Sequence, residues 1–504
     1  MNTMTLQRST KRVLKVIGSF VLLVLVLLIP DGSRIPPAPA AKRPFIWNQD
    51  ARWEALEARF SAARARGCDR LAEAIRDSLA RGTQYIELLG SVHPDPGDTV
   101  FGQTEETVFS LGPVIGACPS FLPEYLNLVV ALRERVKDAS VRWNMSSPET
   151  RNRMYRLLYG SRAALEEVML QQSIDSIPSG ILCTDEPSVT PGTTILGIRV
   201  HSGDILVSRG GAPTSALIAR GNDYPGNFSH VALLSVDSLT GNAAIIESHI
   251  ERGVAIATMD DYLRDTKLRV MVLRLRSDLP AMQRDPMLPH RVATRVLQEA
   301  RTRHIPYDFA MDFHDTTKYF CSEVVSTAYR QAGISLWMGL SSISSPGVAA
   351  WLAAFGVEHF ETQEPSDLEY DPQLRVVAEW RDRDALFKDH VDNAVTDAML
   401  EEAERGERLG YDWYALPAAR VAKAYSWVLN LFGDVGPVPE GMTATTGLIY
   451  KMFVERHAAI KRHVLLAAEE FRQAHGYTPP YWDLLKFARE GAGTSAGGPA
   501  DALR

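Results

Sequence analysis

The chain has 504 residues, of which 45% are hydrophobic and 23% are charged, and its formal net charge is −7 at pH 7. Such a chain can bury a large core and is long enough for two or three domains. The acidic balance gives no support to a nucleic-acid partner, because binding phosphates requires a basic face. The four cysteines, Cys68, Cys118, Cys183 and Cys321, lie far apart, which argues against a zinc ribbon or a dense disulfide scaffold.

The first residues join a basic stretch to an apolar one. Residues 1–15 contain basic side chains and no acid, and residues 16–29 are then apolar up to Pro30. This apolar run is short for a membrane span, which takes about 20 residues, and is typical of a signal-peptide core. We therefore expect residues 1–44 to hold a cleaved export signal, with Ala38, Pro39 and Ala40 as the cleavage pattern, or an uncleaved membrane anchor, followed by a Pro-rich linker.

Either interpretation of residues 1–44 places most of the chain outside the cytoplasm, in the periplasm or elsewhere in the cell envelope. In that oxidising compartment one disulfide could form among Cys68, Cys118 and Cys183, and the sequence leaves the pairing open. The same segment predicts a possible association with the membrane.

Residues 45–178 are expected to form a helical region. In residues 50–67 and 69–82 apolar side chains recur every three or four positions, as they do on one face of a helix, and Gly82 is expected to end the second helix. A third helix is predicted in residues 121–138. A fourth begins at Ser147, a favourable N-cap, with Pro148 in the first turn. We interpret this region as a support or a lid.

Residues 185–380 have a different sequence pattern. Short β-branched stretches separated by Gly, Asp, Asn and Ser predict strands in residues 193–200, 203–210, 229–237, 242–249 and 269–276. Helical patterns follow in residues 290–303 and 321–333, so the block is α+β. Residues 385–490 are expected to be helical again, and residues 491–504 have the composition of a disordered tail.

Cys321 is the first residue of a predicted helix. Val324, Val325 and Ala328 follow it at helical spacing, and Gly333 lies where the helix should stop. The exposed N–H groups and the macrodipole at a helix start favour the thiolate, the nucleophilic form, and the same groups can donate to an oxyanion. The alternative is a small buried hydrophobe, the usual role of a free cysteine.

A thiolate nucleophile needs a base and the base needs an orienting partner. His230 comes immediately before a strand-like stretch, so it can present its ring at the end of a sheet. The next predicted strand forms a hairpin with it and carries Glu247 and His249 on one face, and either could orient His230. The alternatives are a structural histidine and a solvated carboxylate.

Four stretches now stand in a definite order: GDILVSRG, FSHVALL, IIES with RGVAI, and IPYDFAMDFHDTTKYFCSEVV. This order resembles the circularly permuted papain-like amidases of the YiiX/YebB type, which are relatives of the NlpC-type cell-wall cysteine peptidases and, more distantly, of the lecithin:retinol acyltransferases. The resemblance covers roughly residues 190–350. It implies an α+β fold with a permuted papain-like core, an antiparallel sheet and a nucleophile helix, between N- and C-terminal helical regions.

The resemblance also implies roles for individual residues. Cys321 resembles the nucleophile, His230 the general base and acid, and Glu247 the third member, with His249 as the alternative. The family often has Tyr directly before the cysteine, where this chain has Phe320. The candidates for supporting the substrate, the oxyanion or the cysteine loop are Tyr319, Ser322, Tyr307 and Asp308.

The leading functional hypothesis is a cysteine-dependent amidase or peptidase that works through a thioacyl intermediate, with cell-wall peptides as a natural substrate for an exported chain. An acyltransferase or thiol lipase acting on lipid esters is the alternative with the same triad, and a non-catalytic scaffold that binds in the cell envelope is the third. No cofactor is expected. His201, His249, His304 and His314 fit no metal-ligand spacing, so no metal site is predicted.

Overall fold

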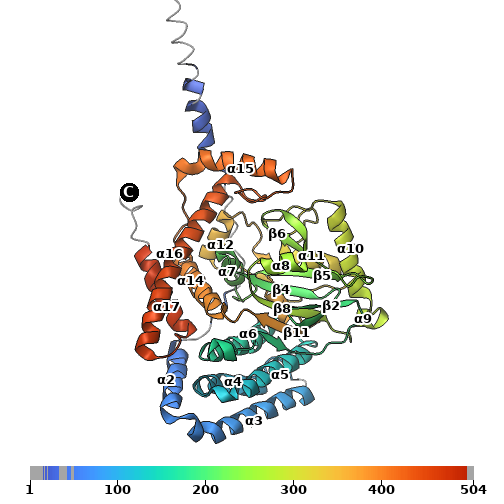
Figure 1. Ribbon diagram of the computed structural model, residues 1–504, viewed down its shortest axis with the longest axis vertical. Helices are drawn as coiled ribbons and strands as arrows, with labels where there is room; N and C mark the ends of the chain where they lie inside the picture. The colour runs from blue at the N-terminus through green and yellow to red at the C-terminus, as the bar shows by residue number, and fades with distance from the viewer. Residues whose placement is uncertain are drawn as a thin grey trace, which may run out of the picture.

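The computed structural model describes residues 15, 17–19, 21–32, 43–46, 50–92 and 94–495. At its centre lies a seven-stranded antiparallel sheet in the order β1-β11-β8-β4-β5-β6-β7, with helices below it and beside it (Figure 1). This mixed architecture confirms the predicted α+β class. The strands are β1 (Gly180–Leu182), β4 (Ile205–Gly210), β5 (His230–Val236), β6 (Ala243–His249), β7 (Gly253–Thr258), β8 (Lys267–Leu275) and β11 (Leu374–Arg381).

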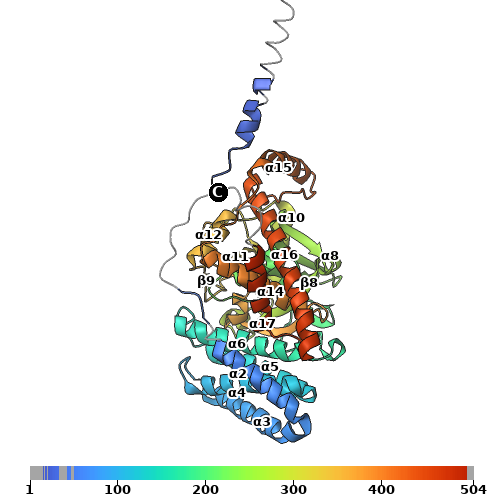
Figure 2. The same cartoon turned by 90° about the vertical axis from the view of Figure 1, so that its left-hand side faces the viewer.

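The N-terminal helices stack at one end of the molecule, as the side view shows (Figure 2). They are α2 (Asp50–Arg66), α3 (Cys68–Val92), α4 (Thr99–Ala117), α5 (Leu122–Ser140) and α6 (Pro148–Leu170). Ser147 is the N-cap of α6, as predicted, although its side chain makes no cap hydrogen bond. A disulfide joins Cys68 to Cys118 and so ties the start of α3 to the end of α4.

Gly82 does not end a helix, which corrects the prediction. Helix α3 continues through it to Val92. A Cβ atom at Gly82 would lie 3.1 Å from the side chain of Leu128, so the glycine allows α5 to approach α3 closely. The glycine therefore serves helix packing, and the cost of its flexibility within a helix is about 1 kcal/mol.

Residues 193–200 form a hairpin and not a single strand. The hairpin consists of β2 (Gly192–Ile195) and β3 (Ile198–His201), which pair only with each other. Leu196 and Gly197 both have positive φ, 51° and 79°, as a two-residue hairpin turn requires. A further small pair is made by β9 (Ser341–Ser342) and β10 (Glu361–Thr362).

The two faces of the central sheet are covered by different elements. Val231 and Leu233 pack with Val324 and Val325 under α11 (Cys321–Arg330), beside α10 (Leu288–Thr302). On the opposite face, Ala232 and Leu234 of the same strand pack with Tyr262 of α8 (Met259–Arg264). The remaining helices of this region are α7 (Pro213–Arg220), α9 (Pro280–Arg284), α12 (Pro346–Ala354) and α13 (Asp367–Tyr370).

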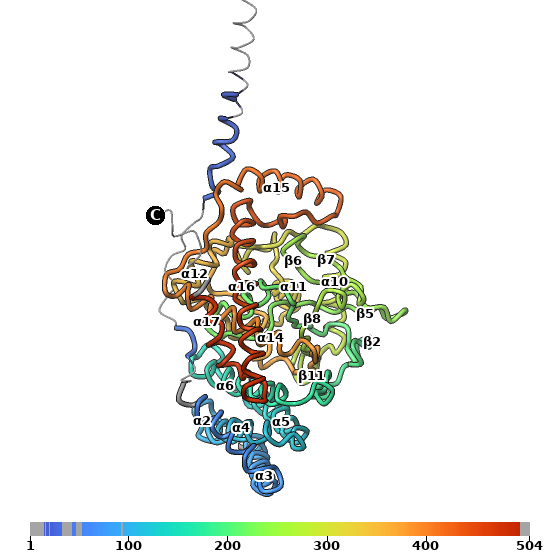
Figure 3. The backbone as a smooth tube through the Cα atoms, turned by 60° about the vertical axis from the view of Figure 1, so that its left-hand side comes forward, coloured from blue at the N-terminus to red at the C-terminus, as the bar shows by residue number. Residues whose placement is uncertain are grey.

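The C-terminal helices lie along one side of the sheet domain, with α15 across its end (Figure 3). They are α14 (Leu386–Glu404), α15 (Leu416–Asn430), α16 (Ala444–His475) and α17 (Tyr481–Ser495), with a 3₁₀ turn η3 (Trp413–Ala415) before α15. Because α17 extends to Ser495, the expected disordered tail is helical in its first five residues. The expected cleavage pattern, Ala38 to Ala40, and residues 496–504 lie outside the described residues. Within the described part of the chain, no helix is both long and apolar enough for a membrane crossing.

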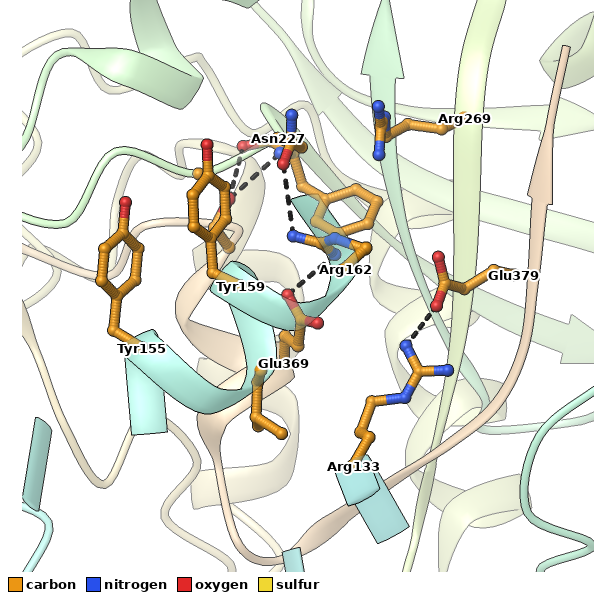
Figure 4. A network of polar contacts seen from close by, with 12 residues as sticks. Arg133, Tyr155, Tyr159, Arg162, Asn227, Arg269, Glu369 and Glu379 are labelled. Carbon is orange, nitrogen blue, oxygen red and sulfur yellow. Dashed lines mark hydrogen bonds and ion pairs between the residues drawn. The ribbon is translucent and has the colours of Figure 1, made fainter. Parts of the chain in front are cut away.

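A buried network of charged side chains joins the N-terminal helices to the sheet (Figure 4). Arg162 of α6 lies 2.8 Å from Glu369, and Arg133 of α5 pairs with Glu379 of β11. Arg269 of β8 returns to α6, with 2.6 Å between its Nη1 and a carboxylate oxygen of Glu166. The side chains of these residues are at most 7% exposed. The helical region is therefore part of the same packed body as the sheet.

Candidate active site

Cys321 is the first residue of α11 and is 5% exposed. Its Sγ lies 3.9 Å from the carbonyl oxygen of Ser229, to which the thiol donates. The backbone N–H of Val231 also lies close enough to the sulfur to lower the pKa of the thiol. The sulfur therefore sits against the backbone on both sides of His230, at the start of β5.

The resting thiol of Cys321 is protonated. Burial raises its pKa to about 12, and the nearby carboxyl of Glu364 acts in the same direction. The N–H of Val231 and the hydroxyl and N–H of Ser322 oppose this change without overcoming it. The expectation that a helix start favours the thiolate is therefore wrong for the resting site, because desolvation of the charged form outweighs the helix-terminal groups.

One carboxylate binds both histidines of the site. The Nε2 of His230 lies 2.7 Å from Oε2 of Glu247, and the Nε2 of His249 lies 3.0 Å from Oε1. The strand register explains this arrangement, since Ala232 of β5 is directly opposite Glu247 of β6 and places His230 near it. Glu247 and His249, which the sequence left as alternatives, thus belong to one cluster.

The protonation states in this cluster follow from burial and pairing. Burial lowers the pKa of His230, although the bond to Glu247 partly compensates, so the imidazole is neutral at pH 7. Burial would raise the pKa of Glu247, but its hydrogen bonds to His230 and His249 hold that pKa far below the usual range. The carboxylate is therefore ionised and acts as an acceptor for two ring N–H groups.

The sulfur and the imidazole approach the end of β5 from different sides. Side chains alternate between the two faces of a strand. Val231 faces α11, so its neighbour His230 is on the opposite face, together with Ala232. In agreement, the charge of Glu247 contributes to the raised pKa of Tyr262, which lies on that opposite face. Among the described residues the sulfur makes no hydrogen bond to an imidazole nitrogen, and its acceptor is the Ser229 carbonyl.

The four predicted supporting residues have different positions. Tyr307 lies near the sulfur, since burial and Cys321 both raise its pKa. Asp308 organises the loop before the cysteine by accepting from the N–H groups of Ala310 at 3.0 Å and Asp312 at 2.7 Å.

The other two predicted supporting residues, Ser322 and Tyr319, also have different positions. The Ser322 hydroxyl is buried beside Cys321 and has no partner of full hydrogen-bond geometry in the part of the chain that is described. Tyr319 contributes its backbone carbonyl, which accepts from Ser248 Oγ at 2.7 Å. Its hydroxyl has Glu299 of α10 and Arg303, the residue after that helix, as charged neighbours.

Glu364 is a residue of the site that the sequence did not single out. It is 4% exposed, one of its carboxyl oxygens has no partner among the described residues, and it raises the pKa of both Cys321 and Tyr307. Burial and, to a smaller extent, the charge of Asp367 raise the pKa of Glu364 well above its usual range. No motif marks it, because it lies in an irregular loop far along the chain.

The histidine cluster also has the donors for a metal ion. His230, Glu247 and His249 each offer one ligand atom, and these atoms lie within 4.8 Å of one another. Two histidines and a carboxylate form a known ligand set of catalytic zinc. His201 and His304 are elsewhere, bound to the Thr190 carbonyl at 2.8 Å and to Glu440 at 3.0 Å. The sequence spacing of the histidines did not reveal this possible ligand set, because its members come together only when the β5–β6 hairpin forms.

A cavity between the helices is separate from this cluster. It has a volume of about 540 Å³, lies between α2, α6, α14 and α17, and is lined by residues that include Phe45, Trp53, Tyr159, Asp397 and Tyr481. None of the predicted site residues lines it.

Residues 199–378 match the model of a family described as permuted papain-like amidase enzymes, YaeF/YiiX, of the C92 family. The match confirms the resemblance found in the sequence and the permuted papain-like core, and it includes every predicted site residue. It supports a hydrolase of the amidase type.

Among solved structures, the metalloprotein yiiX from Escherichia coli O157:H7 is 18% identical with a TM-score of 0.27, and the match covers 35% of this chain and 95% of that chain. A TM-score of 0.27 is too low to support an argument about this chain. No curated protein matches the chain.

Proposed function

We propose that the protein is a cysteine amidase of the cell envelope in which Cys321, His230 and Glu247 act together on peptide amides such as those of the cell wall. The observation that carries this proposal is the position of the Cys321 sulfur, 3.9 Å from the carbonyl of Ser229, the residue before His230, while His230 itself is bonded to Glu247 at 2.7 Å. The match of residues 199–378 to amidase-type enzymes supports the reaction class.

The hydrogen bond between His230 Nε2 and Glu247 leaves Nδ1 as the nitrogen for the sulfur. Because the two groups lie on different sides of the end of β5, the proposed reaction requires a rearrangement there. The thiol leaves the Ser229 carbonyl, the sulfur and the His230 ring come together past the end of the strand, and the proton passes to Nδ1 as the sulfur attacks the amide carbonyl. N–H groups at the start of α11 donate to the oxyanion. The imidazolium then protonates the leaving amine, the C–N bond breaks and a thioester remains. Water attacks the thioester, His230 takes a proton from it, and the acid is released with the thiol restored.

The test is hydrolysis of a muropeptide by the purified full chain and by variants. Cys321→Ala is expected to lower kcat/KM by about a thousandfold or more, because the nucleophile is lost. Glu247→Gln is expected to lower it by about a hundredfold, because the ionised acceptor that orients His230 is removed. His249→Gln is the matched control and retains most of the activity in a thiol mechanism.

Addition of a chelator separates this proposal from metal catalysis. Activity that survives chelation and disappears in Cys321→Ala supports the thiol mechanism. Activity that survives in Cys321→Ala and disappears on chelation or in His249→Gln contradicts it and assigns the chemistry to the cluster of His230, Glu247 and His249. A chain that cleaves no substrate in any form supports a binding scaffold.

A second candidate function is an acyltransferase or thiol lipase with the same residues. It is favoured by one observation: the segment after α15, which carries exposed apolar side chains, contacts the turn that follows His249, with a hydrogen bond of 3.2 Å from Glu440 N–H to the Glu251 carbonyl. Turnover of a phospholipid ester in place of the muropeptide would favour this candidate.

A further inference from the structure

Helix α15 presents an apolar face to solvent. The exposed apolar side chains of η3, α15 and the turn after it form what we call the α15 patch: Trp413, Tyr414, Val421, Tyr425, Trp427, Val428, Leu431 and Phe432. Trp427 is 63% exposed and Phe432 is 79% exposed, although side chains of this size are usually among the most buried.

The patch reverses the usual arrangement of a surface helix. Val421, Tyr425, Val428 and Phe432 recur at helical spacing on the outward face, where charged residues are normal. The two charged side chains of α15 make hydrogen bonds to other parts of the chain. Lys423 donates to the carbonyls of Pro439 and Glu440 at 2.8 and 2.7 Å, and Arg420 binds the N-terminal segment. An exposed patch of this kind marks an interaction surface.

The N-terminal segment leaves the molecule beside this patch. Arg420 Nη1 donates to the carbonyl of Val26 at 2.9 Å, and Asp31 accepts from Thr445 Oγ1 at 3.0 Å. The described residues of the segment expose further apolar side chains, including Leu22 at 63% and Ile29 at 61%. Figures 1 and 2 show α15 lying across one end of the molecule and the segment continuing away from the body on the same side.

We propose that the α15 patch lies in the interface of a lipid bilayer. Trp and Tyr prefer the headgroup level, where their apolar rings are buried and their polar atoms stay hydrated, and a helix with an apolar face lies in the plane of that interface. The adjoining apolar segment favours a bilayer over a protein partner, because the segment and the α15 patch lie at the same end of the molecule and are joined by the hydrogen bond from Arg420 to Val26. The contact between Glu440 and Glu251 then holds the turn after His249 close to the lipid.

The experiment places an environment-sensitive fluorophore on the full chain at one of two positions. Phe432→Cys provides the attachment point in the patch, and Leu239→Cys provides the control, since Leu239 is 94% exposed in the hairpin turn between β5 and β6. The unsubstituted chain measures any labelling of Cys183 and Cys321, which are free. Each labelled chain is mixed with vesicles of phosphatidylethanolamine and phosphatidylglycerol that carry a lipid-bound quencher.

The label at position 432 is expected to be quenched by the lipid and to lose its accessibility to aqueous iodide, at a depth of about 5–10 Å, whereas the label at position 239 stays accessible. The double change Trp427→Ser with Phe432→Ser is expected to weaken vesicle binding by about tenfold or more, and Leu239→Ser by much less. The proposal would be overturned if the chain did not bind vesicles, or if the label at position 432 stayed as accessible to iodide as the label at position 239. It would also be overturned if the label at position 432 became shielded without vesicles as the protein concentration rises, which would indicate contact with a second copy of the chain. Cys321→Ala is expected to behave as the unsubstituted chain, so the result is independent of the thiol chemistry.

Discussion

Burial is the largest influence on the pKa of three acidic groups around the nucleophile helix. It raises the pKa of Cys321 to about 12 and that of Glu323 to about 9, and it raises that of Glu364 well above its usual range. The Cys321 thiol and the Glu323 carboxyl therefore keep their protons at pH 7. A sequence can show that a cysteine begins a helix, a position that favours the thiolate. It does not show how deeply the thiol is buried, and desolvation has the larger effect on its pKa here.

Glu323 provides a prediction about stability and pH. Its folded-state pKa of about 9 exceeds the ordinary value of 4.5, so between these values the folded chain holds a proton that the unfolded chain has lost. The free energy of unfolding therefore falls as pH rises through this window. Glu323→Gln removes the titration and retains an oxygen for the N–H of Phe320, which now donates to Glu323 at 3.0 Å.

We expect Glu323→Gln to be more stable than the unsubstituted chain by about 1 kcal/mol or more at pH 8, with a smaller difference at pH 5. Denaturant unfolding at a series of pH values measures this difference. Glu73→Gln, at an exposed position of α3, is the control and should show no trend with pH. A constant difference for Glu323→Gln across the window would contradict the assignment.

Much of the candidate site could be predicted from residue types and spacing. Cys321 does begin a helix, and the hairpin does bring Glu247 to His230, because the i, i+2 spacing and a short turn fix which side chains share a face. The position of the sulfur relative to the imidazole could not be predicted, since it depends on how α11 packs over the sheet. Glu364 could not be found either, because its contact with the site is purely tertiary.

At the scale of elements, the predictions failed where packing overrides local preference. Helix α4 was not predicted, and its sequence explains the omission: TVFGQTEETVFSLGPVIGA contains three glycines and Pro113, yet its apolar side chains are buried between α3 and α6. Strands β7 and β11 were also missed, although β11 joins β8 to β1 in the sheet. Strands β5 and β6 were found, because each is a short apolar run bounded by turn-forming residues.

The disulfide between Cys68 and Cys118 provides a prediction at this scale. The two residues are 50 positions apart, and closing such a loop restricts the unfolded chain. We expect the double change Cys68→Ser with Cys118→Ser to lower the free energy of unfolding by about 2–4 kcal/mol. Reductant should lower the stability of the unsubstituted chain to the same level and leave the double variant unchanged. Equal stability of both chains under oxidising conditions would show that the bond contributes nothing.

Over the whole molecule, the helical regions and the sheet are joined by buried charges. Arg162, Glu369, Arg133 and Glu379 connect α5 and α6 to the sheet region, and Trp53 of α2 stacks on Trp482 of α17 with 5.7 Å between ring centroids. The sequence did not indicate this connection, because charged residues within a helical pattern usually form a solvated face. The family match, which is limited to residues 199–378, does not include these helices.

Loss of one partner from a buried ion pair is expected to be costly. Arg162→Ala removes the ion-pair partner of the fully buried Glu369, with Arg133 and Lys137 as its remaining charged neighbours, and we expect the free energy of unfolding to fall by about 3 kcal/mol. The double change Arg162→Leu with Glu369→Leu should recover most of this loss. Arg264→Ala, which breaks an exposed pair with Asp261, is the control and should cost less than about 1 kcal/mol. Calorimetry should show one transition for the described body, and two separate transitions would contradict a shared core.

The buried pair of Arg162 and Glu369 also constrains the order of events during translation. Its two members are separated by 207 positions, so the arginine leaves the ribosome long before its carboxylate is made. At elongation rates of about 5–20 residues per second, the delay is roughly 10–40 s. Throughout that interval the newly made α6 carries a cation whose final environment is dry but not yet assembled. The N-terminal helices therefore cannot reach their final packing as an early, self-sufficient unit, and the nascent chain must keep this surface hydrated until the strands arrive.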